Sequence, residues 1–427
     1  MRIQKEQIED HNRKTAKSHS DGLSNLHRHM DQKKISFEAV VQRLSDFQVA
    51  IPSWSLGAGG TRFGRFPMGG EPGSLEQKIE DVGLLHSLNR SSGAISLHIP
   101  WDIPENTDAI KALAREHDIV FDAVNSNTFQ DQPGQKHSYK FGSLSHTDAD
   151  VREQAIAHNL EVIHHGEALG SKAITIWLAD GSNFPGQQNF RQALRRTFES
   201  LESIYSQMPA DWKMLVEYKP FEPNFYSMVV PDWGTSFLLA TKLGDRAKSL
   251  VDLGHHLPNT NIEQIAAILM NEGKLGGFHF NDSKYGDDDL TTGSINPYQL
   301  FLIFNELLDE PDGPSGPWSQ ISWMIDASHN IKDPLEDLLQ SVEGIKTALA
   351  QALLVDRAAL QDARGANDAV MAQQILEDAF RTDVRSLLRE SRIQKGAAAD
   401  PLGLYRALEM RKALIRERGR DSVATGL

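Results

Sequence analysis

The chain has 427 residues, a formal net charge of −14 and no cysteine, and 40% of its residues are hydrophobic. Its acidic balance argues against nucleic-acid binding, and no run reaches the roughly 18 apolar residues of a membrane span. The absence of cysteine excludes disulfides and thiolate chemistry, so any metal must be held by His, Asp and Glu. The polar N-terminus lacks the apolar core of a signal peptide, and we expect a cytoplasmic protein.

Residues 1–46 are polar and are predicted to form an N-terminal helical segment. After them, short apolar runs alternate with longer amphipathic stretches up to residue 332. The apolar runs, which are typical of strands buried on both faces, are 47–54, 95–101, 119–127, 172–180, 213–219, 248–256, 276–282 and 322–330. The helical stretches between them include 76–88, 107–117, 150–168, 188–206, 261–272 and 296–308. Eight strands separated by helices predict an α/β fold, a (β/α)8 TIM barrel over 47–332, with a doubly wound open sheet as the alternative.

The pattern changes in the C-terminal part, residues 333–427. Asp333 and Pro334 are typical of a helix start, and leucines then recur at three- and four-residue spacing. Further helices are predicted at 366–391 and 401–418. This extension is too long for the closing helix of a barrel. We expect an additional helical arm that packs on the barrel wall or on a second subunit and serves oligomerisation.

In a barrel of this kind the functional groups gather at the carboxyl ends of the strands. Glu217, Asp252, His279 and Asp326 stand at the ends of the predicted strands five to eight. Each of them alone is better explained as a hydrogen-bonded residue of the core. Four such ends together indicate a metal site, because carboxylates and an imidazole suit Mn²⁺, Mg²⁺ or Co²⁺.

A second acidic element, with Asp287, Asp288 and Asp289, follows the seventh strand. Such a run by itself is typical of a solvated loop. It lies only a few residues beyond His279, however, so it can fold over the barrel mouth. There His255 could join Asp287 and Asp289 in a second metal site, and two cations sharing a carboxylate could hold neighbouring substrate oxygens.

Other candidate residues also stand at predicted strand ends. Lys219 faces the same side as Glu217, and either balances the carboxylates or donates to a developing oxyanion. His98 either moves a proton on a substrate hydroxyl or bonds a neighbouring strand. Three aromatic residues offer apolar walls, either for packing or for contact with a carbon chain: Trp54, Phe129 and Trp177.

The glycine-rich segment 57–66, GAGGTRFGRF, follows the first predicted strand. It does not fit the dinucleotide-binding motif, because Arg62 stands where the third glycine would be, and the surrounding pattern is not a Rossmann unit. We therefore expect a mobile loop over the active site, or one that reaches into a neighbouring subunit's site.

Several segments together resemble the L-rhamnose isomerases, a group of xylose-isomerase-like barrels. The resemblance extends from about residue 48 to 370 and is weaker at both ends. The segments that carry it are PSWSLGAGGTRFGRFP, SLHIPWD, FDAVNSNTFQDQPGQKHSYKFGSLSHT, DGSNFPGQ, VEYKPFEP, VDLGHHLPNTNIE, GKLGGFHFNDSKYGDDDL and MIDASHN.

The resemblance implies an aldose–ketose isomerase that interconverts L-rhamnose and L-rhamnulose with two divalent cations, usually Mn²⁺. It assigns the first cation to Glu217, Asp252, His279 and Asp326, and the second to Asp252, His255, Asp287 and Asp289. It further places Lys219 near the substrate's O1 and links His98 to ring opening. In such a site a metal-bound hydroxide held by Asp326 could shuttle the proton between O2 and O1. Trp54, Phe129 and Trp177 match the apolar wall of the substrate site.

Phe63 matches an aromatic residue contributed by a neighbouring subunit, which implies a homotetramer. One departure is Tyr218, which stands where these relatives carry histidine. Strand alternation predicts that its side chain points away from the site, so the departure puts little in doubt. Ala327, beside Asp326, could alter specificity at the margin.

Three other functions are consistent with parts of the pattern. A ketose 3-epimerase on a similar barrel would use one metal and a pair of glutamates, whereas strand eight offers Asp326 and the acidic loop suggests two metals. A metal-dependent phosphodiesterase is disfavoured by the net charge. A sugar-binding or metal-storage protein would not require Lys219 and His98 beside two metals.

Overall fold

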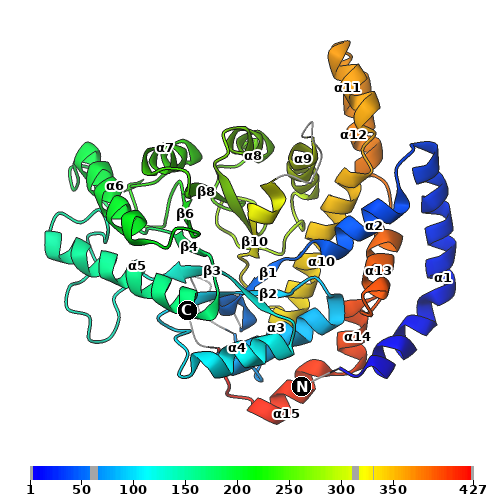
Figure 1. The fold of residues 1–427 in the computed structure, drawn as a ribbon, viewed down its shortest axis with the longest axis horizontal. Helices are drawn as coiled ribbons and strands as arrows, with labels where there is room; N and C mark the ends of the chain where they lie inside the picture. The colour runs from blue at the N-terminus through cyan, green and yellow to red at the C-terminus, as the bar shows by residue number, and fades with distance from the viewer. Residues whose placement is uncertain (1–2, 58–65, 310–316, 330, 425–427) are drawn as a thin grey trace.

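The computed structural model describes residues 3–57, 66–309, 317–329 and 331–424. Its centre is a closed barrel of eight parallel strands, as predicted, and the open doubly wound sheet is excluded (Figure 1). Around the barrel the strand order is β1-β10-β9-β8-β6-β4-β3-β2. The barrel strands are β1 (Ala50–Pro52), β2 (Ala94–Ile99), β3 (Val120–Ser126), β4 (Ala173–Ile176), β6 (Lys213–Glu217), β8 (Ala247–Asp252), β9 (Leu275–Phe280) and β10 (Ser322–Ile325). A separate antiparallel pair is formed by β5 (Gly181–Ser182) and β7 (Ser227–Met228).

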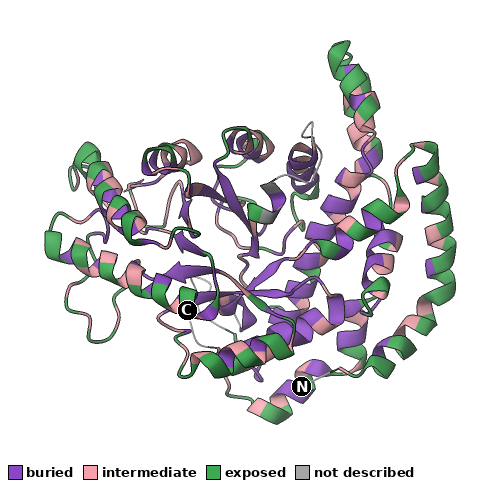
Figure 2. Cartoon of the chain, viewed as in Figure 1, coloured by how far each residue is buried: buried purple, intermediate pink, exposed green. Residues whose placement is uncertain are grey.

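Burial on both faces explains why these apolar runs form barrel strands. Every residue of β9 is buried, and the strand alternates between two environments. Phe278 and Phe280 stack on Trp323 of the neighbouring strand, while Gly277 lies so close to Leu250 that a Cβ atom there would come within 2.8 Å of it. Figure 2 shows a buried barrel inside helices that are partly exposed.

An outer ring of helices covers the barrel, and most of them begin at a residue whose side chain accepts a backbone N–H bond. The caps with this bond are Ser74, Asn106, Asp148, Asn189, Asp232 and Asp333. The helices are α3 (Leu75–Asn89), α4 (Thr107–Glu116), α5 (Ala149–Leu169), α6 (Phe190–Gln207), α7 (Trp233–Leu243), α8 (Ile262–Asn271), α9 (Pro297–Leu308) and α10 (Pro334–Leu353). Because α10 follows β10 and packs against both α9 and α3, it takes the place of the eighth barrel helix.

The remaining helices come from the two ends of the chain and lie beside the barrel, where α1, α2 and α13 pack together (Figure 1). They are α1 (Lys5–Gln32), α2 (Phe37–Asp46), α11 (Arg357–Gly365), α12 (Ala369–Phe380), α13 (Arg385–Gln394), α14 (Pro401–Ala407) and α15 (Met410–Arg418). No helix among the described residues is long and apolar enough to cross a membrane. The domain limits at 46/47 and 332/333 and the role of the arm in oligomerisation stay predictions.

The terminal helices differ from their predicted extents. The prediction of continuous helix over 366–391 is wrong, because α12 ends at Phe380 and α13 begins at Arg385. There Asp383 accepts the backbone N–H of Arg385, and such a local bond competes with helical pairing. The helix predicted at 401–418 is likewise divided, at Glu409, whose φ of 51° is left-handed. The N-terminal segment also holds two helices, which are separated at Lys34.

Lys346 of α10 is a buried cation that makes stability depend on pH. Its Nζ donates to Ser91 Oγ at 2.6 Å, and only 2% of the residue is exposed. Burial, reinforced by Arg392, lowers the pKa of Lys346 from 10.5 to about 7. The unfolded chain keeps the proton up to the higher value, so burying the lysine costs most at or below about pH 7 and progressively less above it.

We therefore expect Lys346→Met to raise the free energy of unfolding by more than about 1 kcal/mol at about pH 6.5. The gain over the wild type should shrink towards about pH 9.5, because there the native lysine is already neutral. Urea unfolding of both proteins at the two pH values measures the difference. A gain that does not change with pH would contradict the lowered pKa.

Candidate metal centre

Four predicted ligands meet at the carboxyl ends of neighbouring strands. Glu217 ends β6, Asp252 ends β8, His279 belongs to β9 and Asp326 follows β10. The barrel register pairs Asp252 directly with His279. One donor atom from each of the four residues lies within 4.8 Å of all the others, as a single bound cation requires.

The atoms of this group point towards a common centre. His279 Nδ1 lies 3.3 Å from Glu217 Oε1, 3.6 Å from Asp252 Oδ2 and 3.5 Å from Asp326 Oδ2. His279 Nδ1 and Asp252 Oδ2 are buried and have no hydrogen-bond partner of good geometry. Buried carboxylates that converge in this way are costly unless a cation compensates them, and this donor set fits a divalent ion.

Neighbouring groups keep the Glu217 carboxylate ionised in spite of its burial. Burial alone would raise the pKa of Glu217, but the adjacent His279 and His255 imidazoles outweigh it and hold that pKa below its usual range. Correspondingly, Glu217 and its neighbouring carboxylates overcome burial and raise the pKa of His279 well above its ordinary value. A divalent ion would replace these protons, because metal ligands must be deprotonated.

The predicted second set lies against the first. His255 Nε2 is 3.1 Å from Asp287 Oδ1, and His255 Nδ1 is 3.2 Å from Glu217 Oε1. Burial, reinforced by the negative charges of Asp287, Asp326 and Asp252, raises the pKa of Asp289 well above its usual value. Among the described residues, the ligands predicted for the first cation are the only four whose donor atoms lie together in one compact group.

Lys219 is the fixed cation of the site. Its Nζ donates to Asp287 Oδ2 at 2.6 Å and to Glu222, and it lies 5.2 Å from the centre of the Trp177 ring. Burial would lower the pKa of Lys219, but Asp287 and Glu222 outweigh it and raise that pKa to about 12. The side chain is therefore a protonated donor and not a base.

Two further acidic residues have contacts to which the sequence assigned no role. Glu222 was not predicted, although its position three residues after Lys219 was the available signal. Asp288, by contrast, accepts the backbone N–H groups of Lys284 and Tyr285 at 2.6 and 2.9 Å. It thus shapes the acidic loop while Asp287 and Asp289 face the pocket.

Aromatic rings form part of the wall of the pocket in which these carboxylates lie. The His98 ring lies 5.2 Å from Trp54, 4.7 Å from Trp101 and 5.6 Å from Phe129, measured between ring centres. Burial lowers the pKa of His98 to about 4 despite the nearby carboxylates, so the imidazole is neutral near pH 7. Trp54 also donates its Nε1–H to Asp326 Oδ1 at 2.9 Å, which fixes one oxygen of that carboxylate.

The predicted residues share one pocket, apart from Asp252, which lies buried behind it, and Phe63, which is outside the described residues. Those that line the pocket are Trp54, His98, Phe129, Trp177, Glu217, Lys219, His255, His279, Asp287, Asp289 and Asp326. Polar residues that were not predicted also line it, namely Asn125, Ser126, Thr175 and Ser328. Because acids, a lysine and aromatic rings line it together, the pocket suits a small hydroxylated molecule with a carbon face.

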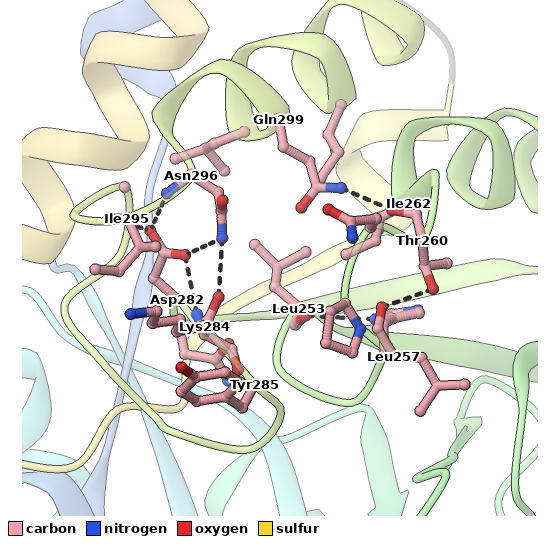
Figure 3. Close-up of a pocket in the computed structure, with 18 residues that line it drawn as sticks. Leu253, Leu257, Thr260, Ile262, Asp282, Lys284, Tyr285, Ile295, Asn296 and Gln299 are labelled. Carbon is pink, nitrogen blue, oxygen red and sulfur yellow. Dashed lines mark hydrogen bonds between the residues drawn. The ribbon is translucent and has the colours of Figure 1, made fainter.

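Another pocket lies between the loops that follow β8 and β9 and the start of α9 (Figure 3). Within it the Asp282 carboxylate accepts the backbone N–H groups of Ile295 and Asn296 at 2.7 and 2.9 Å, and Gln299 donates to the Thr260 carbonyl. None of the predicted site residues lines it, so this pocket is distinct from the metal centre.

Comparison with known proteins agrees with this fold. The family model described as the xylose isomerase-like TIM barrel matches residues 91–310. A probable sugar isomerase of Mesorhizobium japonicum is 52% identical over 396 residues, which cover 92% of this chain and 91% of the relative. A probable sugar isomerase of Rhizobium meliloti is 52% identical over 387 residues, covering 91% and 90% of the two chains. The chain therefore belongs to the xylose isomerase-like TIM barrel family.

Among solved structures, an L-ribulose 3-epimerase has a TM-score of 0.51 to this chain. It is 14% identical, and the match covers 76% of this chain and 98% of that one. At this identity the likeness supports the barrel fold alone.

Proposed function

We propose that the protein is a metal-dependent aldose–ketose isomerase and that it interconverts L-rhamnose and L-rhamnulose. The observation that carries this proposal is the compact group of Glu217, Asp252, His279 and Asp326 beside the protonated Lys219. The names of the two relatives, each a probable sugar isomerase, support the reaction class. The choice of L-rhamnose rests on the sequence resemblance.

Two divalent cations would be held at the proposed site, with Mn²⁺ as the first candidate from the resemblance and Co²⁺ or Mg²⁺ as the alternatives. When bound, they supply positive charge that orients neighbouring sugar oxygens and stabilises negative charge on them. The first would be held by Glu217, Asp252, His279 and Asp326. The second would be held by Asp252, His255, Asp287 and Asp289.

In the proposed reaction several of the side chains that line the pocket each have their own role. Lys219 donates to O1 of the open-chain sugar, where negative charge grows as hydrogen moves between C1 and C2. Asp326, with one oxygen fixed by Trp54, takes part in the proton transfer between O2 and O1. The neutral His98 accepts or returns the proton that accompanies ring opening. Trp177 and Phe129, whose ring centres are 5.1 Å apart, pack against the carbon face.

The ketose 3-epimerase remains the rival function. It would need a pair of glutamates that exchange protons on opposite faces of C3. Strand β10 is instead followed by Asp326, whose side chain is shorter than that of glutamate and is already bonded to Trp54. Turnover in D₂O separates the two reactions. Deuterium at C3 and a ketose product from a ketose substrate would support the epimerase, whereas an aldose–ketose pair without label at C3 supports the isomerase.

Metal removal gives the direct test of the proposed function. Protein stripped with EDTA is expected to lose the conversion of L-rhamnose to L-rhamnulose, and Mn²⁺ is expected to restore it, because the proposal needs cationic stabilisation of the sugar oxygens. Product formation is followed by NMR. Restored activity on another aldose alone would overturn the substrate and keep the chemistry. No isomerisation of any aldose by folded, metal-loaded protein would overturn the reaction.

A further inference from the structure

A buried hydrogen bond joins two residues that the proposed chemistry does not use. Tyr218 Oη lies 2.7 Å from His256 Nε2, and the two rings meet edge to face with their centres 5.3 Å apart. The residues are 1% and 9% exposed, respectively. Such a bond, closed off from water, holds its two segments in a fixed relation.

Which of the two residues donates the hydrogen follows from the contact of the second imidazole nitrogen, Nδ1 of His256. His256 Nδ1 lies 3.4 Å from the backbone carbonyl oxygen of Leu253, which can only accept a hydrogen bond. Leu253 is labelled at the wall of the pocket in Figure 3, which His256 also lines. The hydrogen of the neutral ring is therefore on Nδ1, and Nε2 accepts the hydrogen of the Tyr218 hydroxyl.

The position of the pair in the chain connects it with the metal centre. Tyr218 directly follows Glu217 at the end of β6, and His256 directly follows His255 in the loop after β8. Neither Tyr218 nor His256 lines the pocket that holds the predicted site residues. Their bond thus joins the same two segments that bring Glu217 Oε1 within 3.2 Å of His255 Nδ1.

We propose that Tyr218 and His256 are positioning residues that hold His255 in place for the second cation; this rests on the two-cation site of the proposed function. A hydrogen bond behind a ligand typically changes metal affinity by about 10- to 100-fold when it is lost. The first cation's ligands have supports of their own. Asp252 Oδ1 accepts from Gly254 N at 2.7 Å and from Asn281 Nδ2 at 2.9 Å, and Asp326 is held by Trp54.

Tyr218→Phe tests the proposal, because it removes the hydroxyl and keeps the ring. Calorimetric titration of metal-stripped protein with Mn²⁺ measures both sites without any turnover. We expect the second cation to bind about 10- to 100-fold more weakly, and the first to change less than about threefold. Turnover should recover at high Mn²⁺, so that the variant raises the Mn²⁺ concentration needed for half-maximal rate and leaves kcat almost unchanged.

Tyr405→Phe is the matched control. Tyr405 is also 1% exposed and donates its hydroxyl to Asp333 Oδ2 at 2.9 Å, in the C-terminal helices. The Tyr405→Phe variant should have a lower melting temperature and should bind Mn²⁺ at both sites as tightly as the wild type. His256→Gln, which keeps a side-chain acceptor, should weaken the second site less than His256→Leu does.

Three results would overturn the proposal. If Tyr218→Phe lowers only the melting temperature, as the control does, the pair is structural while the isomerase still stands. If both cations weaken equally, the pair supports the barrel mouth in general and not His255. If the wild type binds a single Mn²⁺ per subunit, the positioning role falls together with the two-cation site, whereas the reaction class is decided separately by the NMR assay.

Discussion

Replacing Lys219 by methionine is expected to lower kcat for the isomerisation by about 10²- to 10³-fold, the usual effect of losing one donor to a developing oxyanion. The pKa of Lys219, raised to about 12, keeps the side chain protonated at every pH at which the protein is assayed. Methionine retains much of the apolar stem beside Trp177 and removes only the charged donor. The substitution should leave sugar binding largely intact, because the charge on O1 grows only as hydrogen moves.

Initial rates, together with sugar binding measured by calorimetry, give the two readouts. Lys274→Met is the control, because Lys274 is also buried but donates only to backbone carbonyls, those of Ala240, Gly244 and Ala247. It should reduce stability and leave kcat within about threefold. If Lys219→Met keeps the wild-type kcat, Lys219 is a counter-ion for Asp287 and Glu222, which is the alternative that the sequence left open.

The barrel and the first metal group could be predicted because each depends on local patterns. A strand buried on both faces must be short and apolar, so β9 is readable from its own residues. A charged residue at the end of such a run is conspicuous, as Glu217 and Asp252 are. The parallel barrel then brings these ends to one side, whatever the details of the loops.

Contacts between loops could not be predicted in this way. The pairing of Lys219 with Glu222 depends on how the chain turns after β6, and the bond between Tyr218 and His256 depends on the packing of two segments 38 residues apart. The break between α12 and α13 was missed for a related reason. The apolar spacing continues across it, while the bond from Arg385 N to Asp383 favours a local turn.

The electrostatics of the pocket depend both on the buried strands and on the contacts between loops. Burial among aromatic rings keeps the His98 imidazole neutral, while Lys219 stays charged because Asp287 and Glu222 lie against it. A neutral acceptor and a fixed cation in one pocket suit a substrate whose proton leaves one oxygen while charge grows on another. Burial sets the first property and pairing sets the second.

Asp252→Asn is expected to have the largest effect of all, with loss of bound metal and a fall in activity of more than about 10³-fold. Asn can keep the acceptor atom that bonds Gly254 N and Asn281 Nδ2. It replaces the unpartnered Oδ2, 3.6 Å from His279 Nδ1, by an amide nitrogen that cannot bind a cation. Because Asp252 belongs to both proposed ligand sets, both cations should bind more weakly.

Metal content after dialysis against Mn²⁺, measured by mass spectrometry, and turnover of L-rhamnose check this expectation. Asp122→Asn is the control, since Asp122 is a half-buried carboxyl near the start of β3 that accepts from Ser322 Oγ at 3.2 Å. Asp122 does not line the pocket that holds the predicted ligands, so an amide there should change metal content and activity little. Wild-type metal content in Asp252→Asn would show that the convergent carboxylates do not hold the cation, and the proposed chemistry would lose its basis.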